Sequence, residues 1–273
     1  MKEFKYNLKL LLIRKEFYIV IIILLLINLV QFCLTKQFLT KQFSVLYYEE
    51  IVSGEFQSLL INENVLFAAY IVIGFPILSS LIFSDSNYHE RVNRTNIYIH
   101  TRLNQKKNIL SKWVISILVP FVVIFTILML NCIAHIVVYG MERGLAVNNY
   151  LPYNASIRNS FYLGNLMMKS PFLYSVAVIA HVSIFCGLLS GLTNAISYKM
   201  KNLVSIHLSI VLLILATSIL LSFVQLSQVS ILTMLQPVFS YLTLFDAFIA
   251  AAILIALNLF FVHRQLKMSE NIL

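Results

Sequence analysis

Long runs of apolar residues dominate this sequence. The first run, FYIVIIILLLINLVQFCL, extends from Phe17 to Leu34 without a charged residue. A helix rises about 1.5 Å per residue, so about 20 apolar residues cross the hydrocarbon core of a bilayer, which is roughly 30 Å thick. Unpaired backbone groups cannot face lipid, and the sequence lacks the short alternating strands of a membrane barrel, so each long run is expected to be a helix. We therefore expect an all-α, multi-pass membrane protein.

Six runs reach the length of a membrane-spanning helix. The predicted spans cover residues 17–35, 65–83, 113–138, 172–197, 203–226 and 244–262. The composition agrees, because 60% of the residues are hydrophobic and only 11% are charged, whereas a soluble domain is about half apolar and about a quarter charged. The loops are too short for a second folded domain. We expect residues 1–273 to form a single transmembrane domain.

The positions of lysine and arginine predict how the chain is oriented. If the N-terminus is cytoplasmic, fifteen of the twenty basic residues lie in cytoplasmic segments and five lie outside. Positive charge favours the cytoplasmic side. We therefore expect a plasma-membrane protein with both termini in the cytoplasm and with loops 36–64, 139–171 and 227–243 outside. This asymmetry also explains the net charge of +9, so nucleic acid is not expected as a partner.

The sequence carries no motif for a cofactor or for catalysis. Cys33, Cys132 and Cys186 lie inside apolar runs and are odd in number, which argues against a disulfide framework or a cysteine metal site. None of the seven glycines begins a phosphate-binding GxxxxGK[ST] loop. The pair Glu49–Glu50 resembles the paired glutamates of CAAX-type intramembrane proteases, but it lacks the following arginine and falls in a predicted outer loop. We expect neither enzyme activity nor a cofactor in this chain.

The N-terminal residues predict a helix that lies along the membrane surface. Residues 2–17 place apolar and basic side chains on opposite faces. The apolar face holds Phe4, Leu8, Leu11 and Leu12, and the basic face holds Lys2, Lys5 and Lys9. This pattern is typical of an interfacial amphipathic helix. The alternative is a first span that starts early and carries a charged collar. No small-residue cleavage site follows the first apolar run, so we expect that run to be retained as a span.

Residues 227–246 predict a different kind of structure. This stretch is apolar, contains no lysine or arginine and is interrupted by Pro237. Proline breaks a helix, and a broken backbone is tolerated at membrane depth only where protein covers it. We expect one or two short re-entrant helices before the sixth span.

The densest positive charge occurs in residues 84–112, between the second and third predicted spans. This segment contains six basic residues and only two acidic ones. Ile99, Leu103 and Leu110 fall close to one helical face, so a short amphipathic helix parallel to the membrane is expected. The alternative is a charged collar in contact with anionic lipid.

The order of residues in this segment resembles a known family. Glu90, Thr95 and the run TRLNQKKNILSK from Thr101 to Lys112 resemble the segment between spans two and three of ABC-2 type transporter permeases. The six predicted spans, the N-terminal interfacial helix and the broken loop before the last span are also similar to that family. Three positions depart from the family pattern: Arg94 stands where glycine is usual, Arg102 where proline is usual, and Gln105 where arginine is usual.

The resemblance implies a permease subunit that is powered by a separate ATPase. Residues 84–112 would contain a coupling helix that seats in a groove of this ATPase, and the ATPase would bind ATP and Mg²⁺. The residues expected to form the ATPase-coupling site are Glu90, Thr95, Thr101, Arg102, Lys106, Lys107 and Lys112. Two permease subunits, identical or paralogous, would enclose a path for export of an amphipathic or hydrophobic substrate such as a peptide, a lipid or a drug.

Small and polar residues inside the predicted spans are further candidates. Small residues repeat at every fourth position of the fourth span, at Ser183, Gly187, Gly191 and Ala195. This stripe favours close packing between helices of one chain, and an interface between subunits is the alternative. The polar residues considered for a substrate path are Asn131, His135 and His181. Structural hydrogen bonding in the bundle interior is the simpler interpretation of these three.

Two other classes of function stay open. A stand-alone channel or ion-coupled transporter would favour inverted repeats and a charged or broken-helix site near mid-membrane, and the sequence shows neither. A membrane scaffold or immunity protein without transport activity is the other class. A neighbouring gene for a protein with a Walker A motif would favour the exporter.

Overall fold

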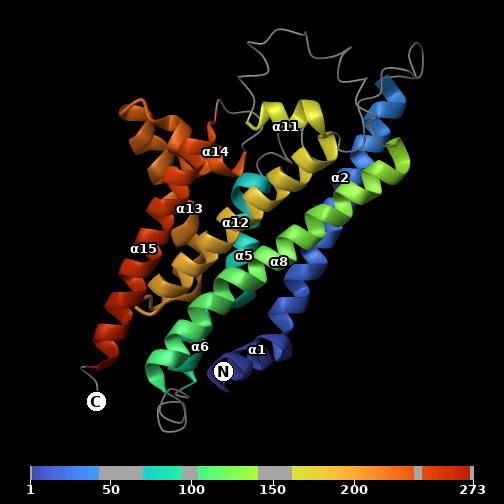
Figure 1. Cartoon of the computed structure of the whole chain (residues 1–273). Coiled ribbons are helices and arrows are strands. Elements are labelled where there is room, and N and C mark those ends of the chain that lie inside the picture. The colour runs from blue at the N-terminus through green and yellow to red at the C-terminus, as the bar shows by residue number, and fades with distance from the viewer. Residues whose placement is uncertain (1, 43–69, 94–103, 141–161, 237–241, 271–273) are drawn as a thin grey trace.

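The computed structural model of the protein describes residues 2–42, 70–93, 104–140, 162–236 and 242–270. Every regular element in these ranges is a helix (Figure 1). Five helices contain an apolar stretch long enough to cross a membrane, namely α2 (Lys15–Gln42), α8 (Gln105–Tyr139), α12 (Pro171–Ser197), α13 (Leu203–Phe223) and α15 (Leu244–Glu270). By the length and composition of these helices, the chain is an all-α, multi-pass membrane protein.

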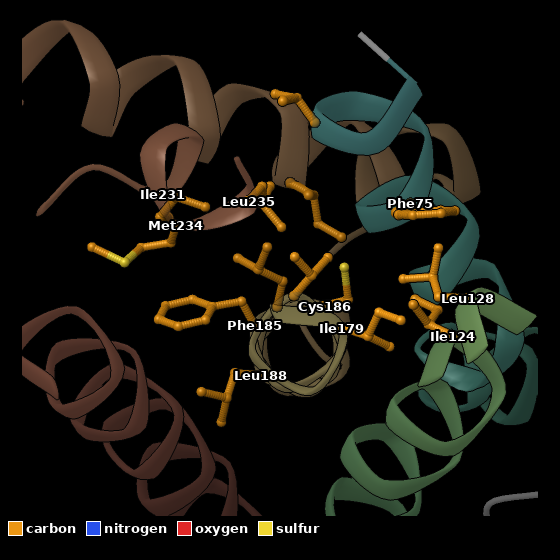
Figure 2. Close-up of a cluster of buried hydrophobic side chains, with 14 of the residues drawn as sticks. Phe75, Ile124, Leu128, Ile179, Phe185, Cys186, Leu188, Ile231, Met234 and Leu235 are labelled. Carbon is orange, nitrogen blue, oxygen red and sulfur yellow. The ribbon is translucent and has the colours of Figure 1, made fainter. Parts of the chain in front are cut away.

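Helix α12 lies at the centre of the bundle. Most of its residues are buried, whereas only a minority of the residues in the other four long helices are buried. It packs against α8 on one side and against α13 and α15 on the other (Figure 1). In Figure 2, Ile179, Phe185 and Cys186 of α12 are surrounded by apolar side chains of the neighbouring helices. Since lipid is as apolar as these side chains, close packing and hydrogen bonds hold such a bundle together.

Helix α5 (Phe75–Phe83) is the described part of the second predicted span. It follows a short π-helix, η2 (Tyr70–Gly74), and the apolar run from Val72 to Phe83 is shorter than the five long helices. It packs against α2, α8, α12 and α13. Residues 65–69 of the predicted span lie outside the described ranges. Five helices of membrane-spanning length are thus present, and a sixth crossing through α5 stays a prediction.

Helix α8 begins earlier than predicted, at Gln105 instead of residue 113. Its first turn is capped by Asn104, whose side-chain oxygen accepts a hydrogen bond from the backbone N–H of Lys107 at 3.2 Å. Residues 105–112 are thus the first turns of a membrane-length helix, and Leu110 belongs to α8. Ile99 and Leu103 lie outside the described ranges, so a separate amphipathic helix there stays a prediction.

Helix α1 (Lys2–Ile13) is separate from α2 and crosses the end of the bundle at an angle to it (Figure 1). The helix breaks at Arg14, so the first span does not simply start early. Asn7 and Leu11 are buried at this end, whereas Phe4 and Leu12 are exposed. The predicted N-terminal helix is present, and its contact with a membrane surface stays a prediction.

Two short helices, α11 (Gly164–Lys169) and α14 (Ile231–Leu235), lie at the end of the bundle opposite to α1 (Figure 1). A 3-10 turn, η3 (Ser227–Val229), precedes α14. Helix α14 buries Ile231, Met234 and Leu235 and packs against α12 and α13, and Figure 2 labels these three side chains. A short helix within residues 227–246 was predicted and is present. Its re-entry into the membrane stays a prediction, and Pro237 lies outside the described ranges.

Candidate functional site

Polar and charged side chains converge where α1 and α6 (Ser86–Val92) meet the start of α8 and the end of α12. We call this group the junction cluster. Its members are Asn7, Arg14, Asp85, Asn87, His89, Glu90, Asn108, Ser111, Lys112 and Asn194. All of them except Arg14 and His89 are buried. Buried polar groups of this kind are tolerated only where they are paired, so the cluster fixes how these four helices meet.

Two buried charges of the cluster form an ion pair between α6 and α8. The Lys112 ammonium donates to the Glu90 carboxylate and also to Asn87 Oδ1, the latter at 3.3 Å. Lys112 is 2% exposed and Glu90 is 8% exposed. Removing either charge would leave the other buried without this ion pair, which costs far more than a surface pair contributes.

A second set of charges connects Arg14, which lies between α1 and α2, to the start of α6. Arg14 Nη1 donates to Asp85 Oδ1 at 2.6 Å, and His89 Nε2 lies 2.9 Å from Asp85 Oδ2. The Arg14 guanidinium also lies over the ring of Phe83, 5.3 Å from its centroid. Asp85 occupies the N-cap position of α6 but does not cap it with its side chain, since Arg14 and His89 hold both carboxylate oxygens.

These contacts shift the pKa values of Asp85 and His89 in opposite directions. Burial alone would raise the pKa of Asp85, but the hydrogen bond with His89 and the charge of Arg14 outweigh it, and the pKa is lowered. The hydrogen bond with Asp85 raises the pKa of His89 against the effect of its partial burial. The cluster therefore favours an ionised Asp85 between two positive partners.

Helix α1 is joined to α8 through one amide. Asn7 Nδ2 donates to Asn108 Oδ1 at 2.8 Å and to Ser111 Oγ at 2.5 Å. All three residues are buried. Asn108 and Ser111 lie three residues apart on one face of α8, so a single side chain of α1 reaches both.

Helix α6 is joined to the end of α12. Asn87 Nδ2 donates to the backbone oxygen of Asn194 at 3.1 Å, and Asn194 Nδ2 donates to Ser86 Oγ at 3.1 Å. The Arg91 guanidinium donates to the backbone oxygens of Ser197 at 2.8 Å and Met200 at 2.5 Å. Arg91 thus binds carbonyl groups at the end of α12 and just beyond it, and the Ser197 oxygen also accepts from the backbone N–H of Met200 at 3.2 Å.

The hydrogen bonds between these segments continue towards the middle of the bundle. Ser84 Oγ lies 3.0 Å from both the backbone oxygen and the hydroxyl of Ser190. Ser190 Oγ donates in turn to the backbone oxygen of Ser79 at 3.1 Å. These contacts lie along α12. Residues 79–91 are therefore attached to that helix at several points.

The sequence-predicted coupling residues fall into three groups. Glu90 and Lys112 are brought together, as the buried ion pair. Lys106 and Lys107 lie on the exposed first turn of α8. The remaining three lie outside the described ranges: Thr95, Thr101 and Arg102. A role for any of these residues in binding an ATPase stays a prediction.

No family model, no curated protein and no solved structure matches this chain.

Two glycines of the small-residue stripe in the fourth predicted span face α8 of the same chain. A Cβ atom on Gly187 would lie 2.7 Å from the backbone oxygen of Ile117, and one on Gly191 would lie 2.4 Å from Ile117 Cγ1. Ser183 and Ala195 are also buried. The two glycines therefore allow α12 and α8 to approach more closely than any larger residue would.

The three residues considered for a substrate path lie in two places. Asn131 Nδ2 donates to Gln31 Oε1 at 2.8 Å, which joins α8 to α2, and His135 Nδ1 lies 2.8 Å from the backbone oxygen of Asn131. His181 lies in the half of α12 that follows Pro171, 3.0 Å from the hydroxyl of Tyr162 and 3.0 Å from the backbone oxygen of Met234. Each residue makes hydrogen bonds within the bundle, and a substrate path stays a prediction.

Within the described part of the chain, no three side chains of His, Cys, Asp or Glu are placed to hold a metal ion. Cys33 is exposed on α2, while Cys132 and Cys186 are buried, and none of the three forms a disulfide with another.

Proposed function

We propose that this chain is the membrane subunit of an ATP-binding cassette exporter of the ABC-2 type, and that a separate ATPase docks on residues 84–112. The attachment of this segment to the bundle carries the proposal. Its first part, α6, is joined to α8 by the Glu90–Lys112 pair and to α12 by Asn87 and Arg91. Its last part is the start of α8 itself. Movement of a docked ATPase would therefore act directly on α8 and α12.

The charge of the segment supports an acidic or mixed-charge docking surface on the partner. Lys106 and Lys107 are exposed next to the cap of α8, whereas the charges of Glu90 and Lys112 are used inside the bundle. Complementary charge at the rim of an interface raises the rate of association and selects the partner. ATP and Mg²⁺ would be bound by that ATPase, and this chain would supply the path and the docking segment.

The remaining parts of the proposal follow from the family resemblance and the charge pattern. The termini and residues 84–112 would be cytoplasmic, because most basic residues belong to these segments. Helix α1, helix α6 and the end of α15 lie at one end of the bundle, which agrees with this orientation (Figure 1). A second copy or a paralogue would complete the path for an amphipathic peptide, lipid or drug, a substrate class that rests on analogy.

Charge reversal on α8 tests the docking site. The variant Lys106→Glu/Lys107→Glu should insert normally into the membrane but lose its ATPase, because it places negative charge at the docking surface. Lys199→Glu/Lys201→Glu is the matched control, since both residues are exposed in the short connection between α12 and α13. Membrane insertion and ATPase co-purification are measured for both. A Lys106/Lys107 variant that keeps its ATPase and exports normally would contradict this assignment.

A further inference from the structure

Helix α1 carries a row of lysines on the face that points away from the bundle. Lys2, Lys5 and Lys9 follow one another at intervals of three and four residues, so they lie on one side of the helix. The opposite side holds Asn7 and Leu11, which are buried. All three lysines are exposed, and none of them forms an ion pair within the described part of the chain. We call them the lysine row. Its positive charge is not balanced by the protein, which favours a negatively charged partner.

Apolar and aromatic side chains border the lysine row on both sides. At 3.6 residues per turn, Phe4 and Leu12 lie on one side of the row, and Tyr6 and Ile13 lie on the other. All four are exposed, and Ile13 is 71% exposed. Lysines beside exposed apolar groups are typical of a helix at the boundary between lipid head groups and acyl chains. This mixture favours a lipid surface over an acidic protein surface as the partner.

Exposed apolar side chains continue from α1 onto the start of α2. Tyr18, Ile19 and Ile22 are exposed there, in a helix whose apolar stretch is long enough to cross a membrane. The Tyr18 hydroxyl donates to the backbone oxygen of Leu12 at 2.9 Å and so joins the two helices at their corner. Tyrosine is enriched where the polar and apolar layers of a membrane meet. This favours a position of the corner, and of α1 with it, at the level of the lipid head groups.

The buried face of α1 is attached to the start of α8. Asn7 bonds to Asn108 and Ser111, as described for the junction cluster. Glu3, the acidic residue of α1, lies close to Asn104 and Lys107 at the cap of α8 instead of beside the lysine row. A partner that holds the exposed face of α1 would therefore also steady the first turns of α8.

We propose that the exposed face of α1 binds anionic phospholipids of the adjacent leaflet, and that this contact steadies the start of α8. The lysine row would contact the negative head groups, and the apolar side chains beside it would lie against the acyl chains. Each basic residue near an anionic membrane surface adds to the attraction, and salt screens it. This surface is separate from the proposed docking site at Lys106 and Lys107, and it does not depend on an ATPase.

The test compares hydrogen exchange of the full chain in nanodiscs of phosphatidylcholine and in nanodiscs of phosphatidylglycerol. We expect the hydrogen-bonded amides of residues 2–13 to exchange on the order of a hundredfold more slowly in phosphatidylglycerol, the factor that three lysines at an anionic surface supply together. Amides of residues 105–111 should slow in the same lipid. High salt should remove most of the difference. The variant Lys2→Gln/Lys5→Gln/Lys9→Gln should exchange alike in the two lipids.

A matched control separates the lysine row from the general positive charge of the chain. Lys199→Gln/Lys201→Gln/Lys267→Gln also removes three exposed lysines, from the connection between α12 and α13 and from the end of α15. It leaves α1 intact and should keep the difference between the two lipids. Loss of the difference in this control as well would overturn the assignment to α1.

Three other outcomes would also contradict the proposal. Equal exchange of α1 in the two lipids would overturn the contact with anionic lipid. Slower exchange of α1 with unchanged exchange at residues 105–111 would overturn the effect on α8. If α1 is protected only when an ATPase is added, whatever the lipid, a protein surface covers the lysine row and the proposal is wrong.

Discussion

Lys112 of α8 reaches Glu90 of α6 inside the bundle, and the two form a buried ion pair. Both residues were expected to contact a partner. The pair instead joins the docking segment to the central part of the fold, while the exposed charge on the described part of this segment includes Lys106 and Lys107.

Neutralising Lys112 should therefore weaken the fold. We expect Lys112→Met to lower the free energy of unfolding by about 3–5 kcal/mol, because the Glu90 carboxylate stays buried without the charge of Lys112. The double variant Glu90→Leu/Lys112→Met should recover most of this loss, since it leaves no uncompensated charge. Unfolding in detergent measures both, with Lys107→Met as an exposed control that should be neutral. A double variant no more stable than Lys112→Met would contradict the role of the pair.

Enlarging Gly187 should separate α12 from α8. We expect Gly187→Leu to destabilise the protein by about 1–3 kcal/mol or more, because the new side chain would meet the backbone oxygen of Ile117. Ala252→Leu is the control, since Ala252 is exposed on α15. Folded yield and melting temperature in detergent are the measurements. Equal behaviour of the two variants would show that Gly187 does not lie in a tight contact.

The Asp85–His89 pair should make stability depend on pH. The raised pKa of His89 stabilises the fold fully below its usual value of 6.5, and this contribution is lost as the pH rises through the higher pKa of the folded protein. The lowered pKa of Asp85 acts in the acid range, where its contribution is present above 3.8 and is lost as the pH falls through the folded value. The melting temperature should therefore fall as the pH rises above about 6.5 and through the raised pKa of His89. The same fall in His89→Gln would show that another group causes it.

Topology can be measured with single engineered cysteines. We expect an impermeant reagent added outside cells to label cysteines at Glu50 and Asn154 but not at Asn104, because the basic segments predict that Asn104 is cytoplasmic. Asn104 is exposed at the cap of α8, so burial would not explain a lack of labelling there. Labelling of Asn104 in intact cells would reverse the proposed orientation.

The sequence predicted those parts of the fold that depend on length and apolar character. The described ranges contain five long helices, because each apolar run is long enough to cross a membrane as a helix whose backbone N–H and C=O groups pair with one another. The interior of the junction cluster could not be predicted in the same way, since Glu90 meets Lys112 only after α6 packs against α8. One signal was available for the contact with α12: Ser190, Asn194 and Ser197 recur at helical spacing in an apolar run, and all three face α5 or α6.

The most direct test of the proposed function is to purify the tagged wild-type chain from its own membrane in mild detergent and to identify what accompanies it. We predict that an ATPase with a Walker A motif co-purifies in a fixed ratio and that the complex hydrolyses ATP. A chain that purifies intact without any ATPase, from a membrane in which it is active, would contradict the exporter account.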